Sequence, residues 1–318
     1  MVGSTVVKDG VVYIGAEADG NLYALRESDG TLKWKAQAGG LIGSTPAVSN
    51  GLVFVASGGK LFAFHKADGS LAWSAATGGE FSSPVVVAGV VFVGSENGGV
   101  YAFEAADGRP LWQAALGAAI DASPAVADGT LFVGTTDGTF YALDAATGAR
   151  LWTYAASGAI TGSAAVRGGV VYAGSQDGAL FALDLATGAL RWSRSAGSST
   201  ASSPAVAGNI LYIAAIASRR DGPVEKIQAR RRSDGRLLWS YTGGHLLAGG
   251  VIEPSPSVAN GVVYAPSYDG TVRAFAADTG AVLWQYTDSG FFASPAIVHG
   301  QVFIAAGGSG NVYDFALP

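Results

Sequence analysis

The stretch Tyr101–Trp112, YAFEAADGRPLW, decides the fold because close copies of it recur along the whole chain. Each copy has an alanine, a glycine six residues later and a tryptophan ten residues after the alanine. A motif repeated this regularly indicates a repeat architecture. All seven tryptophans of the chain belong to it, in the pairs Ala24/Trp34, Ala63/Trp73, Ala102/Trp112, Ala142/Trp152, Ala182/Trp192, Ala229/Trp239 and Ala274/Trp284.

The interval between tryptophans indicates the size of one structural unit. Successive tryptophans are 39, 39, 40, 40, 47 and 45 residues apart. Each interval contains short apolar runs separated by turn residues, such as Asp29-Gly30 and Thr147-Gly148. Strands of about five residues between closely spaced turns indicate a meandering antiparallel sheet. A period near 40 with four strands is typical of a β-propeller blade.

The residues of each unit also predict the order of strands within a blade. The first strand carries Ser-Pro, as at Ser83-Pro84, and proline is tolerated at a sheet edge. Its small side chains suit the crowded axis of a propeller. The second strand is apolar at successive positions, as in Val11–Ile14, so we expect both of its faces to be covered. The last strand alternates, as in Lys33-Trp34-Lys35, which fits the outer edge. There each tryptophan would bury roughly 150–250 Å².

The number of units predicts eight blades. The first three strands occur eight times, but the tryptophan strand occurs only seven times. The last unit ends Val312-Tyr313-Asp314, with aspartate in the alanine position and no tryptophan. We therefore predict an all-β fold, a single domain over residues 1–318. It is an eight-bladed propeller of four-stranded antiparallel blades, the last blade three-stranded. The chain starts inside the first repeat without an export signal, and one interpretation is that the native chain is longer.

Composition excludes several classes of function. The chain of 318 residues has 47 glycines, no cysteine and a net charge of −5. Without cysteine there are no disulfides, thiolate metal sites or cysteine nucleophiles. The acidic balance argues against nucleic acid as a partner, because phosphate binding needs a basic face. Apolar runs such as Val85–Val93 are about half of a membrane span. We expect a monomer without a membrane span.

The Ala-to-Trp motif resembles the tryptophan-docking motif of the PQQ-like β-propeller repeat superfamily, and the resemblance covers the whole chain. That group includes quinoprotein alcohol dehydrogenases, the outer-membrane barrel-assembly lipoprotein BamB and extracellular sensor domains of bacterial kinases. The resemblance is specific for fold and unspecific for function, because functional sites are grafted onto folds. It implies an extracytoplasmic location, in the periplasm or at the cell surface.

The first break in the repeat lies in unit six, which is about seven residues longer than unit five between Ala214 and Ala229. We interpret the insertion as a long hairpin that turns at Asp221-Gly222-Pro223. Seven of the 19 lysines and arginines fall in or just after it: Arg219, Arg220, Lys226, Arg230, Arg231, Arg232 and Arg236. They form either a docking patch for an anionic partner, with Arg219, Arg220 and Lys226 as contacts, or a solvated hairpin whose charges protect an exposed edge.

The second break is the loop Gly243–Pro254, about five residues longer than its counterparts. His245 and Glu253 in this loop are candidate polar contacts, and such a pair can do acid–base work. Leu246 is a candidate apolar contact for a protein partner. The alternative is a loop without a binding role.

A third set of candidates lies before the Ser-Pro strands, at the predicted channel mouth. These are Glu80, Phe81, Asp121, Phe291 and Phe292, which either contact a ligand or plug the mouth. The Asp-Gly pairs at Asp19, Asp137, Asp177 and Asp269 are assigned to hairpin turns rather than to a metal site. His65 and His299 are expected at the surface.

Three functional hypotheses follow. The first is a non-enzymatic scaffold or sensor domain that binds a protein or peptide with its top face, without a cofactor or metal. The second, from the resemblance alone, is a dehydrogenase dependent on PQQ and Ca²⁺. The adjacent cysteines and the insertions that hold the quinone in such enzymes have no match here. The third is a structural or engineered propeller. No nucleotide-binding or hydrolase motif occurs in the chain.

Overall fold

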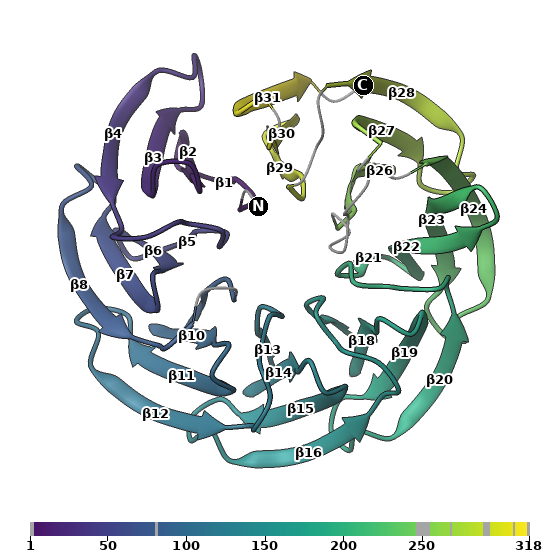
Figure 1. The fold of residues 1–318 in the computed structure, drawn as a ribbon, viewed down its shortest axis with the longest axis horizontal. Coiled ribbons are helices and arrows are strands. Elements are labelled where there is room, and N and C mark those ends of the chain that lie inside the picture. Colours follow the sequence, from purple (N-terminus) through teal and green to yellow (C-terminus); the bar gives the residue numbers. More distant parts are fainter. Residues whose placement is uncertain are drawn as a thin grey trace. The chain divides into compact units, whose positions relative to one another are not determined.

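The computed structural model describes residues 3–79, 82–245, 255–267, 269–288, 293–307 and 309–316. The chain is all-β and forms an eight-bladed β-propeller (Figure 1). Seven antiparallel sheets have four strands, and the eighth, β29-β30-β31, has three. The fold predicted from the tryptophan period is confirmed, including the short last blade. Among the described residues, no helix has the length and apolar character needed to cross a membrane.

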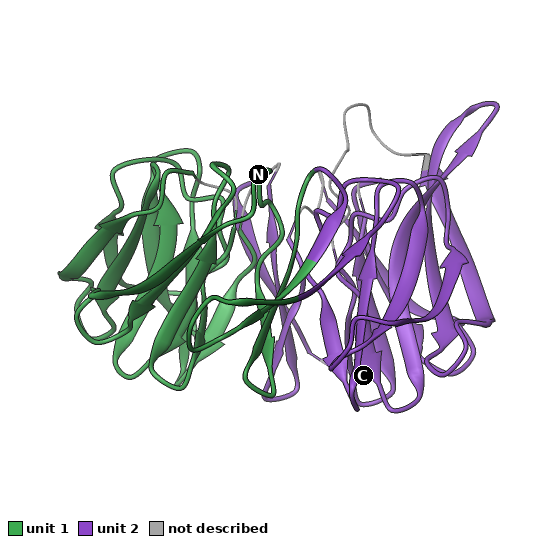
Figure 2. Ribbon diagram, turned by 90° about the horizontal axis from the view of Figure 1, so that it is seen from below, with its two compact units in different colours: residues 1–136, 141–151 green, residues 137–140, 152–318 purple. Residues whose placement is uncertain are grey.

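The first compact unit comprises residues 1–136 and 141–151, and the second comprises residues 137–140 and 152–318, so the boundary passes through the fourth sheet (Figure 2). The strands of the first four blades are β1 (Val6–Lys8), β2 (Val11–Gly15), β3 (Asn21–Arg26), β4 (Leu32–Gln37), β5 (Ala47–Ser49), β6 (Leu52–Ser57), β7 (Lys60–His65), β8 (Leu71–Ala76), β9 (Val85–Val87), β10 (Val90–Gly94), β11 (Gly99–Glu104), β12 (Pro110–Ala115), β13 (Ala125–Ala127), β14 (Thr130–Gly134), β15 (Thr139–Asp144) and β16 (Arg150–Ala155).

The remaining blades follow the same order of one short inner strand and longer strands outside it. They are built from β17 (Ala165–Arg167), β18 (Val170–Gly174), β19 (Ala179–Asp184), β20 (Leu190–Ser195), β21 (Ala205–Ala207), β22 (Ile210–Arg219), β23 (Gly222–Arg231), β24 (Leu237–His245), β25 (Ser257–Ala259), β26 (Val262–Pro266), β27 (Thr271–Ala276), β28 (Val282–Thr287), β29 (Ala296–Val298), β30 (Gln301–Ala306) and β31 (Asn311–Ala316).

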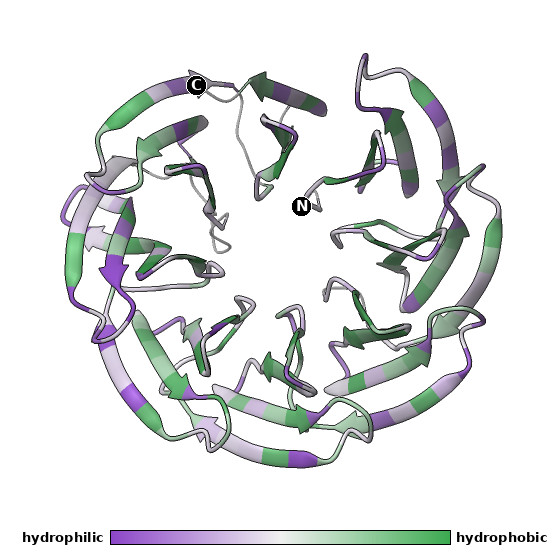
Figure 3. Ribbon diagram, turned by 180° about the vertical axis from the view of Figure 1, so that it is seen from behind, coloured by the Kyte–Doolittle hydropathy of each residue, from purple (hydrophilic) through white to green (hydrophobic). Residues whose placement is uncertain are grey.

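The second strand of each blade forms the core, as its unbroken apolar run predicts. Every residue of β2, β6, β14, β18 and β26 is buried. The outer strands instead alternate between polar and apolar residues, which is visible as changing colour along them in Figure 3. A strand buried on both faces needs neighbouring sheets on each side, so the core of this protein lies between blades.

The tryptophans join neighbouring blades in the way the motif predicts. Trp34 of β4 packs with Val53, Val55 and Phe64 of the next blade, and its indole N–H donates to the carbonyl of Lys66 at 2.9 Å. Equivalent bonds join Trp73 to Ala105, Trp112 to Ala145, Trp152 to Leu185, Trp192 to Arg232 and Trp239 to Ala277. The motif glycine of the next blade lies against the ring, as Gly69 does against Trp34.

The Ser-Pro strands contribute a second connection between blades. The residue before the proline position uses its hydroxyl to accept the backbone N–H of the equivalent residue in the preceding blade. In the first unit the donor–acceptor pairs are Ser4–Thr45, Thr45–Ser83 and Ser83–Ser123, at 2.9–3.1 Å. In the second they are Ser163–Ser203, Ser203–Ser255 and Ser255–Ser294, at 2.8–3.1 Å. These hydroxyls satisfy backbone groups of a neighbouring blade, a role beyond their predicted small size.

Candidate functional site

The insertion in unit six is a β-hairpin that extends its blade at one end. β22 and β23 have ten residues each and pair along their whole length, from Ile210↔Arg231 to Arg219↔Gly222. The hairpin projects beyond the neighbouring strands of its unit (Figure 2). Its turn is the two-residue stretch Arg220-Asp221, so the predicted turn at Asp221-Gly222-Pro223 is wrong by one residue at its start. Gly222 and Pro223 already belong to the ladder.

Neighbouring chain segments support the base of this hairpin on both sides. On one side, the amide of Ser198 donates to the carbonyl of Ile216 at 2.6 Å, and the amide of Ile216 donates to the carbonyl of Ser199 at 3.0 Å. On the other side, β24 runs on to His245, which pairs with Val224. The base is therefore tied into the blade, whereas Arg219 and Arg220 at the tip are exposed.

The seven cations of unit six do not form one patch. Arg219 and Arg220 lie at the tip, and Lys226 is half-buried in the middle of β23. Arg230 is buried eight residues from Gly222, about 25 Å along an extended strand. Arg231 pairs with Asp234 at 3.3 Å. Only the two tip arginines combine exposure with a projecting position, so the anionic docking patch that the sequence suggests is narrowed to them.

Blade six also has polar residues at two positions that are apolar or aromatic in blades one to five. Gln228 replaces the aromatic residue before the motif alanine, and Arg230 replaces the leucine or phenylalanine after it. Both bond to backbone carbonyls of blade five: Gln228 Nε2 to Ala196 at 2.5 Å and Arg230 Nη2 to Ser195 at 2.6 Å. Arg230 Nε also donates to Gln228 Oε1 at 2.8 Å. Because buried polar groups need such partners, the two replacements are compensated as a pair.

A second polar group lies between blades six and seven. Glu225 of β23 is only 3% exposed and receives a hydrogen bond from Ser267. Asp269, in the turn before β27, pairs with Arg273 at 2.7 Å, and both side chains are about 10% exposed. The Arg273 guanidinium also lies over the Tyr241 ring, 5.5 Å from its centroid. The amide of Gly244 at the end of β24 donates to Asp269 at 3.3 Å. This group, called the interblade acid cluster (Glu225, Asp269 and Arg273), thus anchors the extended ends of both β23 and β24.

Burial and charge set the two carboxyl pKa values apart. Burial raises the pKa of Glu225 to about 7, and the charge of Asp269 adds to this, against the opposing effects of Ser267 and Arg273. Burial also acts to raise the pKa of Asp269, but hydrogen bonds from Arg273 and Thr271 outweigh it and the net direction is down. Arg273 is therefore the counter-ion of Asp269, and Glu225 is the group that takes up a proton near neutral pH.

Substituting Glu225 tests this assignment through the pH dependence of stability. The folded protein holds the Glu225 proton more tightly than the unfolded chain, whose pKa is near 4.5. The Glu225 contribution to stability therefore declines as pH rises from about 4.5 to about 7 and is level above that. We expect Glu225→Gln to increase the free energy of unfolding at pH 8 by about 2–3 kcal/mol and to change it little at pH 5. Urea unfolding at both pH values measures this, and an equal effect at both would contradict it.

Two sequence signals could have located this site. The residue before the motif alanine is aromatic in blades one to five and is Gln228 and Arg273 in blades six and seven. Asp269 is assigned to turn chemistry from the sequence, and its Oδ1 does accept the amide of Thr271 at 3.0 Å. The Asp19, Asp137 and Asp177 carboxylates accept the amide two residues on in the same way. Asp269 differs in that it also pairs with an arginine in place of the aromatic residue.

Several candidates from the sequence stay predictions. Glu80, Phe81, Leu246, Glu253, Phe291 and Phe292 lie outside the described residues, as does the His245 side chain. Asp121 is half-buried in the first unit, and burial raises its pKa. Asp121 and the hairpin belong to different units, so no common site is assigned to them. His65 and His299 are exposed, as predicted.

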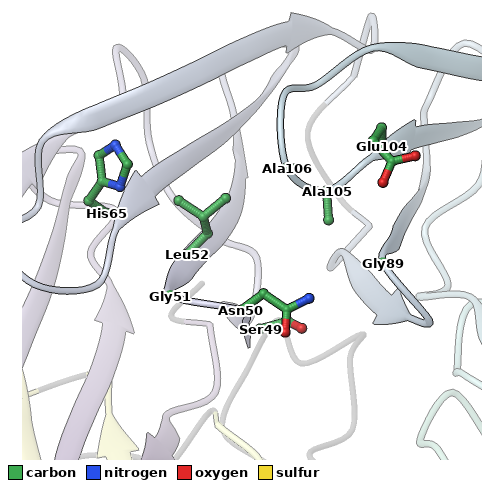
Figure 4. A pocket seen from close by; sticks show the side chains of 9 residues that line it. All are labelled: Ser49, Asn50, Gly51, Leu52, His65, Gly89, Glu104, Ala105 and Ala106. Carbon is green, nitrogen blue, oxygen red and sulfur yellow. The ribbon is translucent and has the colours of Figure 1, made fainter.

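A pocket of about 370 Å³ lies between blades two and three, at the opposite end of the strands from the β6–β7 turn (Figure 4). Its polar lining includes Asn50, His65 and Glu104. The Asn50-Gly51 turn has the left-handed geometry found at the same turn in other blades, for example at Asp9 and Asp128. Regular turns of the repeat thus account for the pocket, and we assign it no ligand.

A quinone and Ca²⁺ site, which the resemblance to quinoproteins would imply, is not matched by the residues that the structure describes. Across them, no group of three or more His, Asp or Glu side chains lies close enough to hold a metal ion. The interblade acid cluster contains two carboxylates, but Arg273 already neutralises one of them. We therefore derive no step through such a cofactor.

Comparisons with known proteins agree with the architecture. Residues 2–83, 75–219 and 198–317 match the family described as outer membrane protein assembly factor BamB. BamB of Shewanella oneidensis is 38% identical over 60 residues, which are 19% of this chain and 14% of that protein. The structure of BamB from Moraxella catarrhalis has a TM-score of 0.81 at 20% identity, over 99% of this chain and 94% of that one.

A quinohemoprotein alcohol dehydrogenase from Pseudomonas putida has a TM-score of 0.77 at 19% identity, over 94% of this chain and 68% of that one. At these identities the structural matches show a shared fold. The family match, in contrast, covers nearly the whole sequence in three consecutive stretches. The chain therefore belongs to the BamB family of PQQ-like β-propeller repeat proteins.

Proposed function

We propose that this protein is a non-enzymatic scaffold that works outside the cytoplasm in the assembly of outer-membrane proteins. It binds a partner protein with the projecting end of blade six. The observation that carries the proposal is that departures from the repeat gather there: the long hairpin, the Gln228–Arg230 pair and the interblade acid cluster. Positions that obey the repeat are explained by packing, so the positions that break it are the best candidates for function.

The proposed contact surface consists of the hairpin tip with Arg219 and Arg220, together with Lys226, His245 and, from the sequence alone, Leu246 and Glu253. Two adjacent exposed arginines favour an acidic segment of the partner, because each guanidinium can bind a carboxylate through two hydrogen bonds. The hydrogen bonds to Ile216 and the pairing of Val224 with His245 hold the hairpin base in one position. A contact surface held in advance loses less entropy on binding.

The scaffold role is favoured over an enzyme for two reasons. The family described by its matched sequence model is an assembly factor. The buried charges of the interblade acid cluster also bond to one another and to the ends of β23 and β24, rather than pointing into a cavity that could hold a substrate.

The test is a double substitution, Arg219→Ala/Arg220→Ala, in cells that produce this protein in place of the wild type. We expect the amount of assembled outer-membrane protein to fall toward the level of a gene deletion, while the level of this protein stays unchanged. Lys33→Ala/Lys35→Ala is the matched control, because both lysines are exposed cations on the regular strand β4. Equal assembly in the deletion strain and the wild type would exclude the proposed role, and equal defects in the two double variants would exclude the proposed surface.

A further inference from the structure

The eighth blade has an outer edge that the repeat covers in every other blade. β31 pairs with β30 from Gln301↔Ala316 to Ala306↔Asn311, and the described part of the chain adds no strand beyond it. In Figure 1, β31 lies at the outer edge of its sheet, whereas β27 in blade seven is followed by β28. An edge strand presents backbone N–H and C=O groups that can pair with another extended segment.

The other blades show what such a segment would face. In blades one, two, three, five, six and seven, the motif alanine is directly opposite the docking tryptophan, as in Ala274↔Trp284. The residue that follows the alanine is usually opposite an apolar residue, as in Phe275↔Val282 and Leu183↔Leu190. By the same register, a segment added to β31 would set its residues against Asp314 and Phe315.

Asp314 changes the chemistry of that place. The equivalent alanines are fully buried, and a small side chain there leaves room for the indole ring. Asp314 is exposed instead, and its carboxylate accepts a hydrogen bond from the Gln301 amide at 2.5 Å. A carboxylate against the face of an indole is unfavourable, because that face carries the negative part of the ring quadrupole. An opposite-charge pair across two strands is favourable.

We propose that the β31 edge binds an extended segment of a partner protein by strand addition. The segment carries a lysine or arginine opposite Asp314 and an apolar residue opposite Phe315. Phe315 is half-buried against Trp284 and Tyr286, with ring centroids 5.2 and 5.3 Å away, so an apolar residue beside it would extend an existing cluster. Charge complementarity at Asp314 and this apolar contact define the occupant. This mode of recognition takes affinity from main-chain hydrogen bonds and specificity from alternate side chains.

The experiment uses two fluorescent peptides and the purified full chain. One has the sequence of residues 281–288, AVLWQYTD, and the other has lysine in place of the tryptophan. Fluorescence anisotropy should show saturable binding of the lysine peptide, about threefold to fivefold tighter than the tryptophan peptide. Asp314→Ala, which restores the residue of the other blades, should reverse this preference, and Asp314→Asn should abolish it.

Three controls make the result specific. A lysine peptide with N-methyl groups on the amides that face β31 should not bind, because strand addition needs those donors. Arg219→Ala/Arg220→Ala should leave peptide binding unchanged, so the failure of the proposed function and the failure of this inference are distinguishable. The melting temperature of each variant verifies folding. The inference is overturned if neither peptide binds, if the wild type and the Asp314→Ala variant show the same preference, or if sedimentation shows that the edge instead joins two copies of this chain.

Discussion

Replacing Trp34 by alanine is expected to lower the free energy of unfolding by about 3–5 kcal/mol, the largest effect of any single substitution considered. The indole ring is 8% exposed and packs in one cluster with Val53 and Phe64 of the second blade. Its ring centroid is 5.9 Å from that of Tyr13, and its N–H donates to the Lys66 carbonyl. Alanine would leave a cavity between two blades and would remove the donor to that carbonyl, and both effects destabilise.

Urea unfolding followed by circular dichroism measures this loss. The control is Leu32→Ala, two residues away on the same strand, because Leu32 is 50% exposed and its removal opens no cavity. We expect the Leu32 variant to stay within about 1 kcal/mol of the wild type. A Trp34 variant as stable as the Leu32 variant would show that the tryptophan does not hold the first two blades together.

Replacing Gly69 by alanine is expected to cost about 3 kcal/mol, for two separable reasons. Gly69 has a φ of +75°, and a left-handed conformation costs a non-glycine residue roughly 1–2 kcal/mol. In addition, a Cβ atom at Gly69 would lie 2.6 Å from Cε3 of Trp34, so the ring would have to move. Overpacking of this kind costs about 1–3 kcal/mol more.

Gly30 provides the matched control for this prediction. It occupies the same turn of blade one with a φ of +68°. No heavy atom of the described residues lies within 4 Å of the Cβ that alanine would add there. Gly30→Ala should therefore show the backbone cost alone, and the difference between the two variants isolates the contact with the indole. Equal losses of stability would mean that the glycine is needed only for its turn and not for tryptophan docking.

The fold could be predicted from the sequence because one contact repeats. The Ala-to-Trp spacing fixes a cross-strand pair, Ala24↔Trp34, that recurs in later blades. The burial of the second strands follows from their unbroken apolar runs. In contrast, Ser83 is recognisable as a small residue of an inner strand, but its bond to the Thr45 amide depends on how two blades face each other. Sequence spacing carries no information on such a contact.

The candidate site could be predicted only in outline. The length of unit six indicates the hairpin, whereas the predicted start of its turn is displaced because Gly222-Pro223 is a strong turn signal and yet lies in the ladder. The count of cations suggests one patch, but strand alternation and length place Arg230 in the core and Arg220 at the tip. Glu225 and the Asp269–Arg273 pair come from two repeats, and nothing in their separate spacing predicts that they meet.

The interblade acid cluster connects the fold to the proposed function. It replaces an apolar contact between blades by charges that bond to the ends of β23 and β24, where the hairpin leaves the blade. Buried ion pairs seldom add much stability, because desolvation offsets their attraction. Their value here is positional: Asp269 accepts the Gly244 amide and fixes the strand that pairs with the hairpin at Val224.

Site-specific photo-crosslinking tests the central claim most directly, namely that the end of blade six is the surface that binds the partner. A benzophenone amino acid would replace Arg220 at the hairpin tip in one variant and Asn97, in the regular turn of blade three, in another. Both residues are exposed and follow the second strand of their blades. We predict a single adduct with a protein of the outer-membrane assembly machinery from position 220 and none from position 97. The same adduct from both positions, or an adduct from position 97 alone, would contradict the account.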